Sequence, residues 1–271
     1  MRSRGFVDAH RGRPHLEAVL AVDVGNTNTV LGVFRRGRLG EYWRIASRPS
    51  ATGDDLLTVL EPLLRKDLAD LASSRSVVVG SVVPALTREY EAAMKRLLGA
   101  VPLVADYRLR LGIRLDVVDP SSVGPDRIAN AVAAVERGRL PAIVVDLGTA
   151  TTFDVVDAKG RYLGGAIAPG VAVSTENLFR SAARLSKVEF KKPERFIGRT
   201  TEESLQSGLF YGAAGQIDAV VRGIRKELGG KAYVVATGGL ASLLAEGSKT
   251  IQSVDPALTL KGFYRIFLLN A

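Results

Sequence analysis

The chain has 271 residues, of which 46% are hydrophobic, values that allow one large domain or two ordinary ones. It contains no cysteine, which excludes disulfides, thiolate metal sites and a cysteine nucleophile and fits a reducing, cytoplasmic compartment. No apolar run reaches the roughly 20 residues that a membrane span needs, so we expect no membrane association.

The formal net charge is +9, and a basic surface attracts anionic partners such as nucleotides and nucleic acids. The basic residues are scattered along the chain, however, for example at Arg35, Arg108 and Lys191. Aromatic residues make up only 6% of the sequence and do not alternate with basic residues in a stripe. The pattern favours a solvated basic surface, and we expect no nucleic-acid partner.

The N-terminal segment, residues 1–16, is basic and poor in apolar residues. No continuous apolar stretch follows its charges, so a secretory signal is not expected and we predict a disordered tail. Both histidines of the chain, His10 and His15, lie in this segment. A catalytic mechanism based on histidine is therefore not expected.

Periodicity of apolar residues and turn signals predict the elements of the first half of the chain. Three strands, a helix, a strand, a helix and a strand are predicted at 17–24, 29–35, 38–45, 54–66, 77–79, 84–98 and 101–105. Thr52 or Gly53 is expected to cap the first helix, and Pro84 lies in the first turn of the second.

The second half of the chain repeats this order after a helix that opens near Asp126. Strands are predicted at 142–146, 151–157, about 161–168 and 232–236, and helices at about 170–183, 202–228 and after 239. The repeat indicates an α/β chain with mixed sheets. We expect an N-terminal lobe of residues 17–121 and a C-terminal lobe of residues 122–271, although the helix at 122–137 fits either lobe.

The pattern Val-Asp-x-Gly-x-x-x-Thr occurs twice, at Val22–Thr29 and at Val145–Thr152, each time after an apolar run. Each copy indicates a buried strand, a tight glycine turn and a second strand running back. One such hairpin in each half predicts a duplicated fold that binds a polyphosphate between its two lobes.

The first hairpin has the residue types of a phosphate loop. Glycine at position 25 lets the backbone approach an oxygen-rich ligand, and successive N–H groups in a turn bind anions. Asp23 would be repelled by phosphate unless a cation lies between them, so it implies Mg²⁺, held through water. A plain hairpin is the alternative, because Asn and Gly favour such turns. The second copy of the pattern favours the ligand site.

The second hairpin offers threonine hydroxyls, including that of Thr149, which can contact phosphate. The Asp146 carboxylate can hold a metal, directly or through water, or can instead cap its own turn. Further along, Thr237-Gly238-Gly239 follows an apolar strand and opens a helix, a setting in which a nucleotide can approach the backbone. The chain has neither a P-loop lysine motif nor a serine nucleophile elbow.

Gly124-Pro125-Asp126-Arg127 lies at a predicted helix start. The positive end of the helix would stabilise the Asp126 carboxylate, which should be ionised, as a proton acceptor must be. Arg127 can pair with an anionic or carbonyl group of an acceptor substrate. From spacing alone, an ordinary helix start with a surface arginine is the preferred interpretation.

A series of short motifs covers nearly everything from residue 18 onward. They are Asp23-Val-Gly-Asn-Thr-Asn28, Gly80-Ser-Val-Val-Pro84, Gly124-Pro-Asp-Arg127, Asp146-Leu-Gly-Thr149, Gly164-Gly-Ala-Ile-Ala-Pro-Gly170, Gly198-Arg-Thr-Thr201, Thr237-Gly-Gly239 and Asp255-Pro-Ala-Leu-Thr-Leu260. In this order they resemble the type III pantothenate kinases, within the superfamily of acetate kinases, sugar kinases, heat-shock ATPases and actin.

The resemblance implies two duplicated ribonuclease H-like lobes with mixed sheets flanked by helices, in an actin-like ATPase architecture. It implies ATP-dependent phosphorylation of the primary hydroxyl of pantothenate to 4'-phosphopantothenate, the first step of coenzyme A biosynthesis. It also implies a homodimer whose substrate pocket is completed by the partner chain.

The resemblance also implies roles for individual residues. Asp126 resembles the general base, and Asp146 the ligand of a monovalent cation, K⁺ or NH₄⁺. The ATP contacts would be Asp23, Val24, Gly25, Asn26, Thr27, Asn28, Thr29, Val30 and Thr149. The pantothenate contacts would be Gly124, Pro125, Asp126, Arg127 and Thr201.

The chain departs from the family pattern at Pro125, where Ala is common, and at Thr200, where Asn is common. It also lacks, between Leu115 and Asp119, the aromatic residue that often precedes the proline before the Gly-x-Asp-Arg motif. Two alternative functions stay open at this point. One is a non-catalytic transcriptional accessory factor on the same fold. The presence of Asp23, Asp126 and Asp146 argues against such a loss of activity. The other is a different small-molecule kinase of the superfamily, acting on a sugar or an acyl acceptor.

Overall fold

A computed structural model describes residues 17–181 and 188–271, which form two compact units. Unit 1 contains the described residues up to Arg114 together with 118–137 and 258–271, and unit 2 contains 115–117 and the described part of 138–257. The predicted tail, residues 1–16, lies outside the described residues, and so do both histidines. Among the described residues, no helix is long and apolar enough to cross a membrane.

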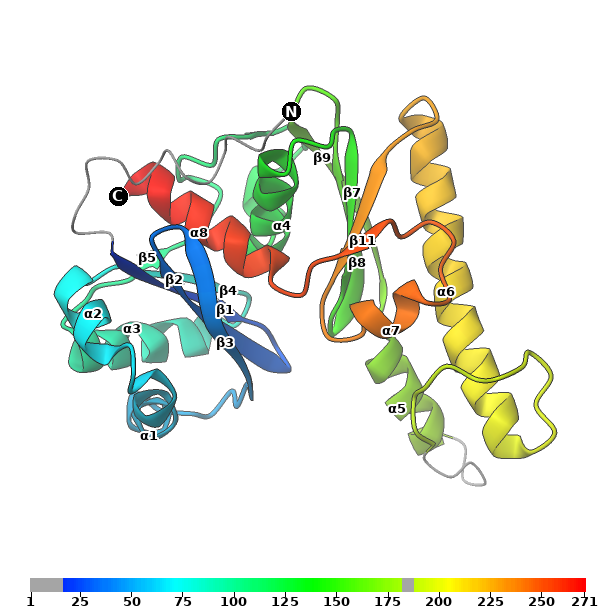
Figure 1. Cartoon of the computed structure of the whole chain (residues 1–271), viewed down its shortest axis with the longest axis horizontal. Helices are drawn as coiled ribbons and strands as arrows, with labels where there is room; N and C mark the ends of the chain where they lie inside the picture. The colour runs from blue at the N-terminus through cyan, green and yellow to red at the C-terminus, as the bar shows by residue number, and fades with distance from the viewer. Residues whose placement is uncertain (1–16, 182–187) are drawn as a thin grey trace. The chain divides into compact units, whose positions relative to one another are not determined.

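Unit 1 is built on a five-stranded mixed sheet with the order β3-β2-β1-β4-β5 (Figure 1). Its strands are β1 (Ala18–Val24), β2 (Asn28–Arg35), β3 (Arg38–Ala46), β4 (Val77–Ser81) and β5 (Leu103–Val104). The central strand β1 pairs antiparallel with β2 and parallel with β4. Because β1 and β4 are apolar nearly throughout, both faces of the sheet are suited to burial beneath helices.

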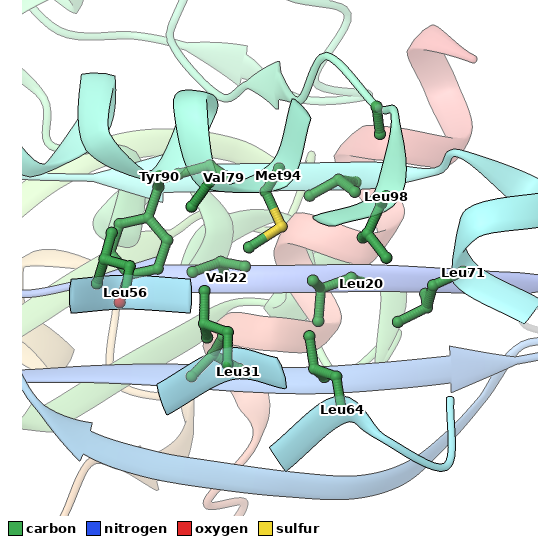
Figure 2. Packing of buried hydrophobic residues seen from close by; sticks show 14 of the residues in the cluster. Leu20, Val22, Leu31, Leu56, Leu64, Leu71, Val79, Tyr90, Met94 and Leu98 are labelled. Carbon is green, nitrogen blue, oxygen red and sulfur yellow. The ribbon is translucent and has the colours of Figure 1, made fainter. Parts of the chain in front are cut away.

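Three helices cover one face of this sheet: α1 (Gly53–Leu64), α2 (Leu68–Ser74) and α3 (Pro84–Leu98). Figure 2 shows the resulting core, in which Leu20 and Val22 of β1 face Leu64 of α1 and Met94 of α3. Alternate residues of a strand point to opposite faces. The side chain of Asp23, between Val22 and Val24 of this core, therefore lies on the opposite face of the sheet.

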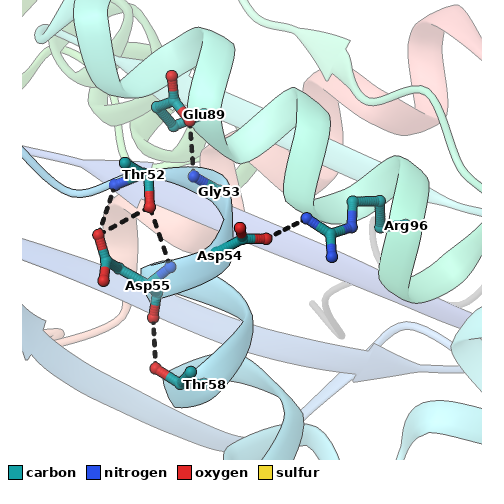
Figure 3. Close-up of polar contacts among 7 residues, drawn as sticks. All are labelled: Thr52, Gly53, Asp54, Asp55, Thr58, Glu89 and Arg96. Carbon is teal, nitrogen blue, oxygen red and sulfur yellow. Dashed lines mark hydrogen bonds and ion pairs between the residues drawn. The ribbon is translucent and has the colours of Figure 1, made fainter.

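The first helix begins with a capping box, as Figure 3 shows. The Thr52 hydroxyl accepts from the Asp55 N–H at 3.3 Å, and the Asp55 carboxylate accepts from the Thr52 N–H at 2.9 Å. The N–H of Gly53 donates to Glu89 of α3 at 2.6 Å. These bonds satisfy donors that the first turn of a helix leaves unpaired, and they fix α1 against α3.

The other face of the sheet carries α8 (Leu258–Asn270), against which α4 (Pro125–Glu136) packs. A Cβ on Gly80 of β4 would overlap the ring of Phe263, and a Cβ on Gly262 would overlap the backbone of Ala129 in α4. Phe34 of β2 stacks on Tyr264 with ring centroids 4.2 Å apart. Glycine is thus required where α8 meets β4 and α4, and these contacts fix α4 onto unit 1.

Unit 2 repeats the topology of unit 1 in a six-stranded sheet with the order β11-β10-β7-β8-β9-β6. The strands are β6 (Arg114–Leu115), β7 (Ala142–Leu147), β8 (Ala150–Val156), β9 (Arg161–Pro169), β10 (Tyr233–Thr237) and β11 (Ser253–Val254). The central strand β7 pairs antiparallel with β8 and parallel with β10, as β1 does with β2 and β4. The predicted duplication of an α/β lobe is confirmed.

The helices of unit 2 are α5 (Val171–Ser181), α6 (Thr201–Glu227) and α7 (Ala241–Ala245). They share a core with alternate residues of the strands, among them Val145 and Leu147 of β7 and Phe153 of β8. The side chain of Asp146, between two of these core residues, therefore lies on the opposite face, as Asp23 does in unit 1.

The observed division differs from the lobes 17–121 and 122–271 expected from the sequence. The helix α4, which the sequence left open between the lobes, packs with unit 1, and α8 returns there from the C-terminus. The elements α2, α8, β6 and β11 were not predicted. The strands β6 and β11 have two residues each, too few to show a period, and α8 is buried on most sides, so it lacks an amphipathic stripe.

One buried carboxylate fastens the turn after α7 to α6. The Asp218 Oδ1 atom accepts from the Ser248 hydroxyl at 2.6 Å and from the Thr250 hydroxyl at 2.7 Å, and the Lys249 N–H donates to Oδ2 at 3.0 Å. Burial by itself raises the pKa of Asp218, but the hydrogen bonds from Ser248, Lys249 and Thr250 outweigh it and leave the pKa below its ordinary value.

Asp218→Ala is expected to lower the free energy of unfolding by about 2 kcal/mol near neutral pH, because buried donors lose a charged acceptor. A carboxyl group with a lowered folded-state pKa stabilises the fold above its unfolded pKa. The contribution is lost as pH falls through the folded-state pKa, so the difference between variant and wild type should shrink in acid. Urea denaturation across that pH range measures it.

The matched control is Asp54→Ala, which removes an exposed carboxylate that pairs with Arg96 on the surface (Figure 3). Exposed pairs contribute little, so this variant should unfold like the wild type. Equal losses in the two variants would show that the Asp218 cluster has no special role.

Candidate active site

The two Asp-x-Gly motifs occupy equivalent places in the two sheets. Asp23 lies one residue from the end of β1 and Asp146 one residue from the end of β7, the central strands of their sheets. Each is followed by a short turn into an antiparallel strand. In open α/β sheets, ligands bind at the carboxyl ends of the strands, which is where both turns lie.

The first turn is a tight loop with a polar tip. The Gly25 N–H donates to the Asn28 carbonyl at 3.0 Å, and a Cβ on Gly25 would lie 2.9 Å from that oxygen. Asn26 and Thr27 are exposed at the tip, where their side chains and N–H groups can meet a ligand. The turn therefore has the bare backbone and neutral donors of an anion-binding loop.

Three other residues of the predicted loop have a structural role in the fold. Val24 and Val30 are buried apolar side chains, so only their backbone atoms can meet a ligand. Thr29 is fully buried, and its hydroxyl lies 2.9 Å from the hydroxyl of Ser47. The backbone N–H of Ser47 donates to the Thr27 carbonyl at 2.9 Å, which ties the turn to the end of β3.

The start of α4 lies close to this first turn. A Cβ on Gly124 would lie 3.6 Å from Cγ1 of Val82, and the Val82 N–H donates to the carbonyl of Val24 at 3.1 Å. The carboxylate of Asp126 folds back over Gly124, where a Cβ would overlap its Oδ1 atom. A side chain at position 124 would therefore displace the Asp126 carboxylate, which lies at the edge of the sheet that carries the turn from Asp23 to Asn28.

The pKa of Asp126 departs from the sequence prediction. The helix start was expected to favour its ionised form, but burial dominates and raises the pKa of this carboxyl above its ordinary value. The Arg127 N–H, 2.9 Å from Oδ1, and the Arg127 charge act in the opposite direction and are weaker. The expectation of a low pKa was wrong, because desolvation of the carboxylate outweighs the helix end. A raised pKa makes Asp126 a stronger base.

In the second turn, the Gly148 N–H donates to the Ala150 carbonyl at 3.1 Å, and Thr149 is exposed at the tip. The Asp146 Oδ1 atom sits in a cradle of bare backbone. A Cβ on Gly238 would lie 2.7 Å from this atom, and one on Gly148 would lie 3.5 Å from it. The turn after β10 thus closes over the Asp146 carboxylate, and φ of Gly238 is 91°, which favours glycine.

The donor set bears on which cations could bind. Within the described ranges, no group of three or more His, Asp or Glu side chains is arranged to hold a metal ion. A single carboxylate at each turn suits an ion that takes most of its ligands from water and phosphate oxygens, as Mg²⁺ does at nucleotide sites. Asp23 and Asp146 each offer one such carboxylate, and the backbone of Gly238 approaches the Asp146 carboxylate closely.

The remaining predicted residues divide between the units. Gly124, Pro125, Asp126 and Arg127 belong to unit 1 with the first turn, whereas Thr149 belongs to unit 2 with Asp146. Thr201 is the first residue of α6, behind the capping residue Thr200, whose hydroxyl accepts from the Glu203 N–H at 3.1 Å. This end of α6 extends past the sheet of unit 2 in Figure 1.

Unit 2 also contains a cavity of about 690 Å³ that sequence reasoning missed. Its lining residues are Ala172, Thr175, Glu176, Phe179, Arg180, Val188, Glu189, Phe190 and Leu240. Thr175 is only 8% exposed, and its hydroxyl has no hydrogen-bond partner among the described residues. Leu240 directly follows Gly238-Gly239, so the cavity adjoins the turn over Asp146. In the sequence, the Thr-Gly-Gly motif was the one indication of a ligand site here, and the residues of α5 gave no indication of a cavity.

Solved structures show the class of this fold. The chain is similar to a protein described as a Baf family transcriptional activator from Campylobacter jejuni, with TM-score 0.57, 20% identity and coverage of 92% and 96% of the two chains. It is also similar to the ADPNP-bound activator of 2-hydroxyisocaproyl-CoA dehydratase from Clostridium difficile, with TM-score 0.52, 14% identity and 93% coverage of each chain. The fold is that of the actin-like ATPases and kinases, as predicted.

Sequence comparison identifies the family within that class. The family model of type III pantothenate kinase matches residues 19–223. A type III pantothenate kinase of Moorella thermoacetica is 45% identical over 252 residues, which are 93% of this chain and 99% of that protein. One from an Anaeromyxobacter species is 46% identical over 244 residues, 90% and 96% of the two chains. The chain belongs to the type III pantothenate kinase family and is a kinase that uses ATP.

Burial of Asp126 predicts the stability of a variant. Because its folded-state pKa is raised, ionised Asp126 opposes folding, and stability is lost as pH rises through that pKa. Asp126→Asn removes this loss, so the variant should melt at the same temperature as the wild type or higher at neutral pH. The difference should vanish below the ordinary carboxyl pKa. Thermal unfolding at both pH values measures it, and a lower melting temperature at neutral pH would contradict it.

Proposed function

We propose that the chain transfers the γ-phosphate of ATP to the primary hydroxyl of pantothenate, with Asp126 as the general base. The product is 4'-phosphopantothenate, and the reaction is the first step of coenzyme A biosynthesis. The observation that supports the assignment of Asp126 is the closeness of Gly124, at the start of α4, to Val82, whose N–H donates to Val24 at the start of the proposed phosphate loop.

The turn from Asp23 to Asn28 is proposed to cradle the ATP phosphates with its backbone N–H groups. The exposed tip residues Asn26 and Thr27 would add neutral donors without adding charge. Thr149, at the exposed tip of the second turn, is proposed as a further ATP contact. Asp23 would hold Mg²⁺ through water, and that ion would offset the negative charge of the phosphates.

Asp126 is proposed to orient the substrate hydroxyl and to accept its proton as the oxygen attacks phosphorus. Its raised pKa supports this role, because an ionised but more basic carboxylate takes a proton more readily. Arg127, the next residue of α4, would bind the pantothenate carboxylate or a carbonyl oxygen. The backbone of Gly124 and Pro125 would provide neighbouring contacts to the substrate.

Asp146 is proposed to hold a monovalent cation, K⁺ or NH₄⁺, which would supply positive charge that a P-loop lysine supplies elsewhere. Support comes from the position of its carboxylate near the end of β7, beside the turns that contain Gly148 and Gly238. A Cβ at position 238 would lie 2.7 Å from Oδ1 and 2.7 Å from the backbone N and C atoms of Leu147, so glycine allows this turn to approach Asp146.

The cavity beside α5 is proposed to take the adenosine end of ATP. Its volume of about 690 Å³ is in the range of small-molecule sites, and its lining is mainly apolar with a few polar groups. Leu240 connects it to the glycine turn over Asp146. The buried Thr175 hydroxyl would find its hydrogen-bond partner on the bound nucleotide.

We further propose that the protein is a homodimer in which Thr201 contacts pantothenate bound to the partner chain. The support is an exposed apolar patch close to Thr201. Phe196 is 70% exposed and Ile197 is 81% exposed, and Phe196 stacks on Tyr211 of α6 with centroids 3.6 Å apart. Large apolar side chains that remain exposed together mark an interface.

The test of the function is coupled ATP consumption with pantothenate, a hexose and acetate as acceptors. Pantothenate alone should support turnover, and a hexose or acetate acceptor would identify another small-molecule kinase. No turnover with any acceptor would favour a non-catalytic accessory factor. Asp126→Asn should lose about 10²-fold or more in kcat while it still binds ATP, because it keeps the fold but not the base. Wild-type kcat in this variant would remove Asp126 as the base.

The test of the adenosine cavity is Thr175→Val, which keeps the shape of the side chain and removes its hydroxyl. The KM for ATP should rise about 5- to 10-fold with little change in kcat, since one hydrogen bond to the bound nucleotide is lost. Thr58→Val, on the exposed side of α1 in unit 1, is the control. Unchanged ATP kinetics in Thr175→Val would exclude the cavity as the adenosine site.

A further inference from the structure

We propose that Asp154 is a positioning residue for the monovalent cation at Asp146, and that it acts through the hydroxyl group of Thr152. By accepting a hydrogen bond from the Thr152 hydroxyl, Asp154 would leave the lone pairs of the Thr152 oxygen directed toward the cation. Thr152 would then be a neutral ligand. The inference rests on the proposed cation at Asp146 and adds two residues to that site.

The pairing of β7 with β8 places these side chains on one face of the sheet. Asp146 is directly opposite Thr152, and Val144 is opposite Asp154. Directly opposite residues of an antiparallel pair have Cβ atoms about 5 Å apart and share a face. Asp146, Thr152 and Asp154 therefore form a continuous polar row, on the face that points away from the helix-covered core.

Asp154 is a fully buried carboxylate with two hydroxyl donors. The Tyr162 hydroxyl donates to Oδ1 at 3.1 Å, and the Thr152 hydroxyl donates to Oδ2 at 3.3 Å. Asp154 and Tyr162 are both 0% exposed, whereas Thr152 is partly exposed beside Asp146. A buried carboxylate is costly unless it is well hydrogen-bonded, and these two hydroxyl donors contribute to meeting that cost.

The direction of the Thr152 hydrogen bond links Asp154 to the proposed cation. A hydroxyl has one proton and two lone pairs, and here the Thr152 hydroxyl is the donor to Oδ2 of Asp154. While the Thr152 proton points to Asp154, the Thr152 lone pairs are left for the side on which Asp146 lies. K⁺ is bound by several neutral oxygen atoms, so this orientation provides a ligand that Asp146 alone does not.

The same argument says why an amide would not serve at position 154. The asparagine side chain that Asp154→Asn introduces has the shape of aspartate and could still accept from Tyr162 through its carbonyl oxygen. The NH₂ group of this asparagine would then face Thr152 and donate a hydrogen bond to its hydroxyl oxygen. That bond would occupy a lone pair of the Thr152 oxygen and leave the Thr152 hydroxyl proton pointing toward the cation. Asp154→Asn therefore reverses the hydrogen bond while it keeps the packing.

The neighbouring Thr151 offers a matched control on the same strand. It is 1% exposed and lies on the other face of β8, with the core residue Phe153. Its hydroxyl has no hydrogen-bond partner among the residues that the structure describes. Thr151→Val thus makes the same chemical change as Thr152→Val, one position away and without reaching Asp146.

The experiment is a titration of the full chain with KCl at fixed ADP and fixed ionic strength, with NaCl as the balancing salt. The readout is the melting temperature, which does not depend on turnover. Thr152→Val and Asp154→Asn should raise the half-saturating KCl concentration about tenfold or more, which is typical when a residue that orients a metal ligand is lost. Thr152→Ser, which keeps the hydroxyl, and Thr151→Val should titrate like the wild type.

The outcomes separate this inference from the site on which it rests. If Asp146→Asn abolishes the K⁺ response but Thr152→Val and Asp154→Asn leave it unchanged, the role of Asp154 is overturned and the cation site stands. If Asp146→Asn responds to K⁺ like the wild type, or the wild type shows no K⁺ effect beyond that of Na⁺, the cation site fails and this inference fails with it. An equal loss in Thr151→Val would show that the effect is packing, and would also overturn the inference.

Discussion

The position of the proposed base depends on the contact between Phe263 and the bare backbone of Gly80. That contact seats α8 on the sheet of unit 1, and the close approach of Gly262 to Ala129 then seats α4 on α8. Asp126 lies in the first turn of α4, so its carboxylate is held at the edge of the sheet that carries the turn from Asp23 to Asn28. Gly80 and Gly262 thus connect the packing of the unit to the placement of the proposed base.

The two units use one strand pattern for different electrostatic purposes. In each, an aspartate at the end of the central strand points away from the helix-covered core, beside a turn of bare backbone. In unit 1 a second carboxylate, Asp126, lies nearby and has its pKa raised by burial. In unit 2 the aspartate faces Thr152 and the buried Asp154 instead. These different surroundings are the basis for proposing proton transfer at Asp126 and a bound cation at Asp146.

Family membership and surroundings support each other at these positions. Relatives that are 45% identical over most of the chain show which family the protein belongs to, and the local contacts give physical reasons for its motifs. A Cβ on Gly124 would overlap the Asp126 carboxylate, and a Cβ on Gly238 would overlap the Asp146 carboxylate and the backbone of Leu147. Substitution at either glycine would act on the neighbouring carboxylate and not only on the backbone.

The sequence by itself determined the repeated order of strands and helices, the two acidic turns and the helix start at Asp126, because these depend on local periodicity and turn chemistry. Only the tertiary structure decided that α4 and α8 belong to unit 1, because α8 is apolar on most sides and its partners lie far away in the chain. Tertiary packing also decided the pKa of Asp126 and the polar row from Asp146 to Asp154, since burial and cross-strand pairing bring together groups that no local pattern relates.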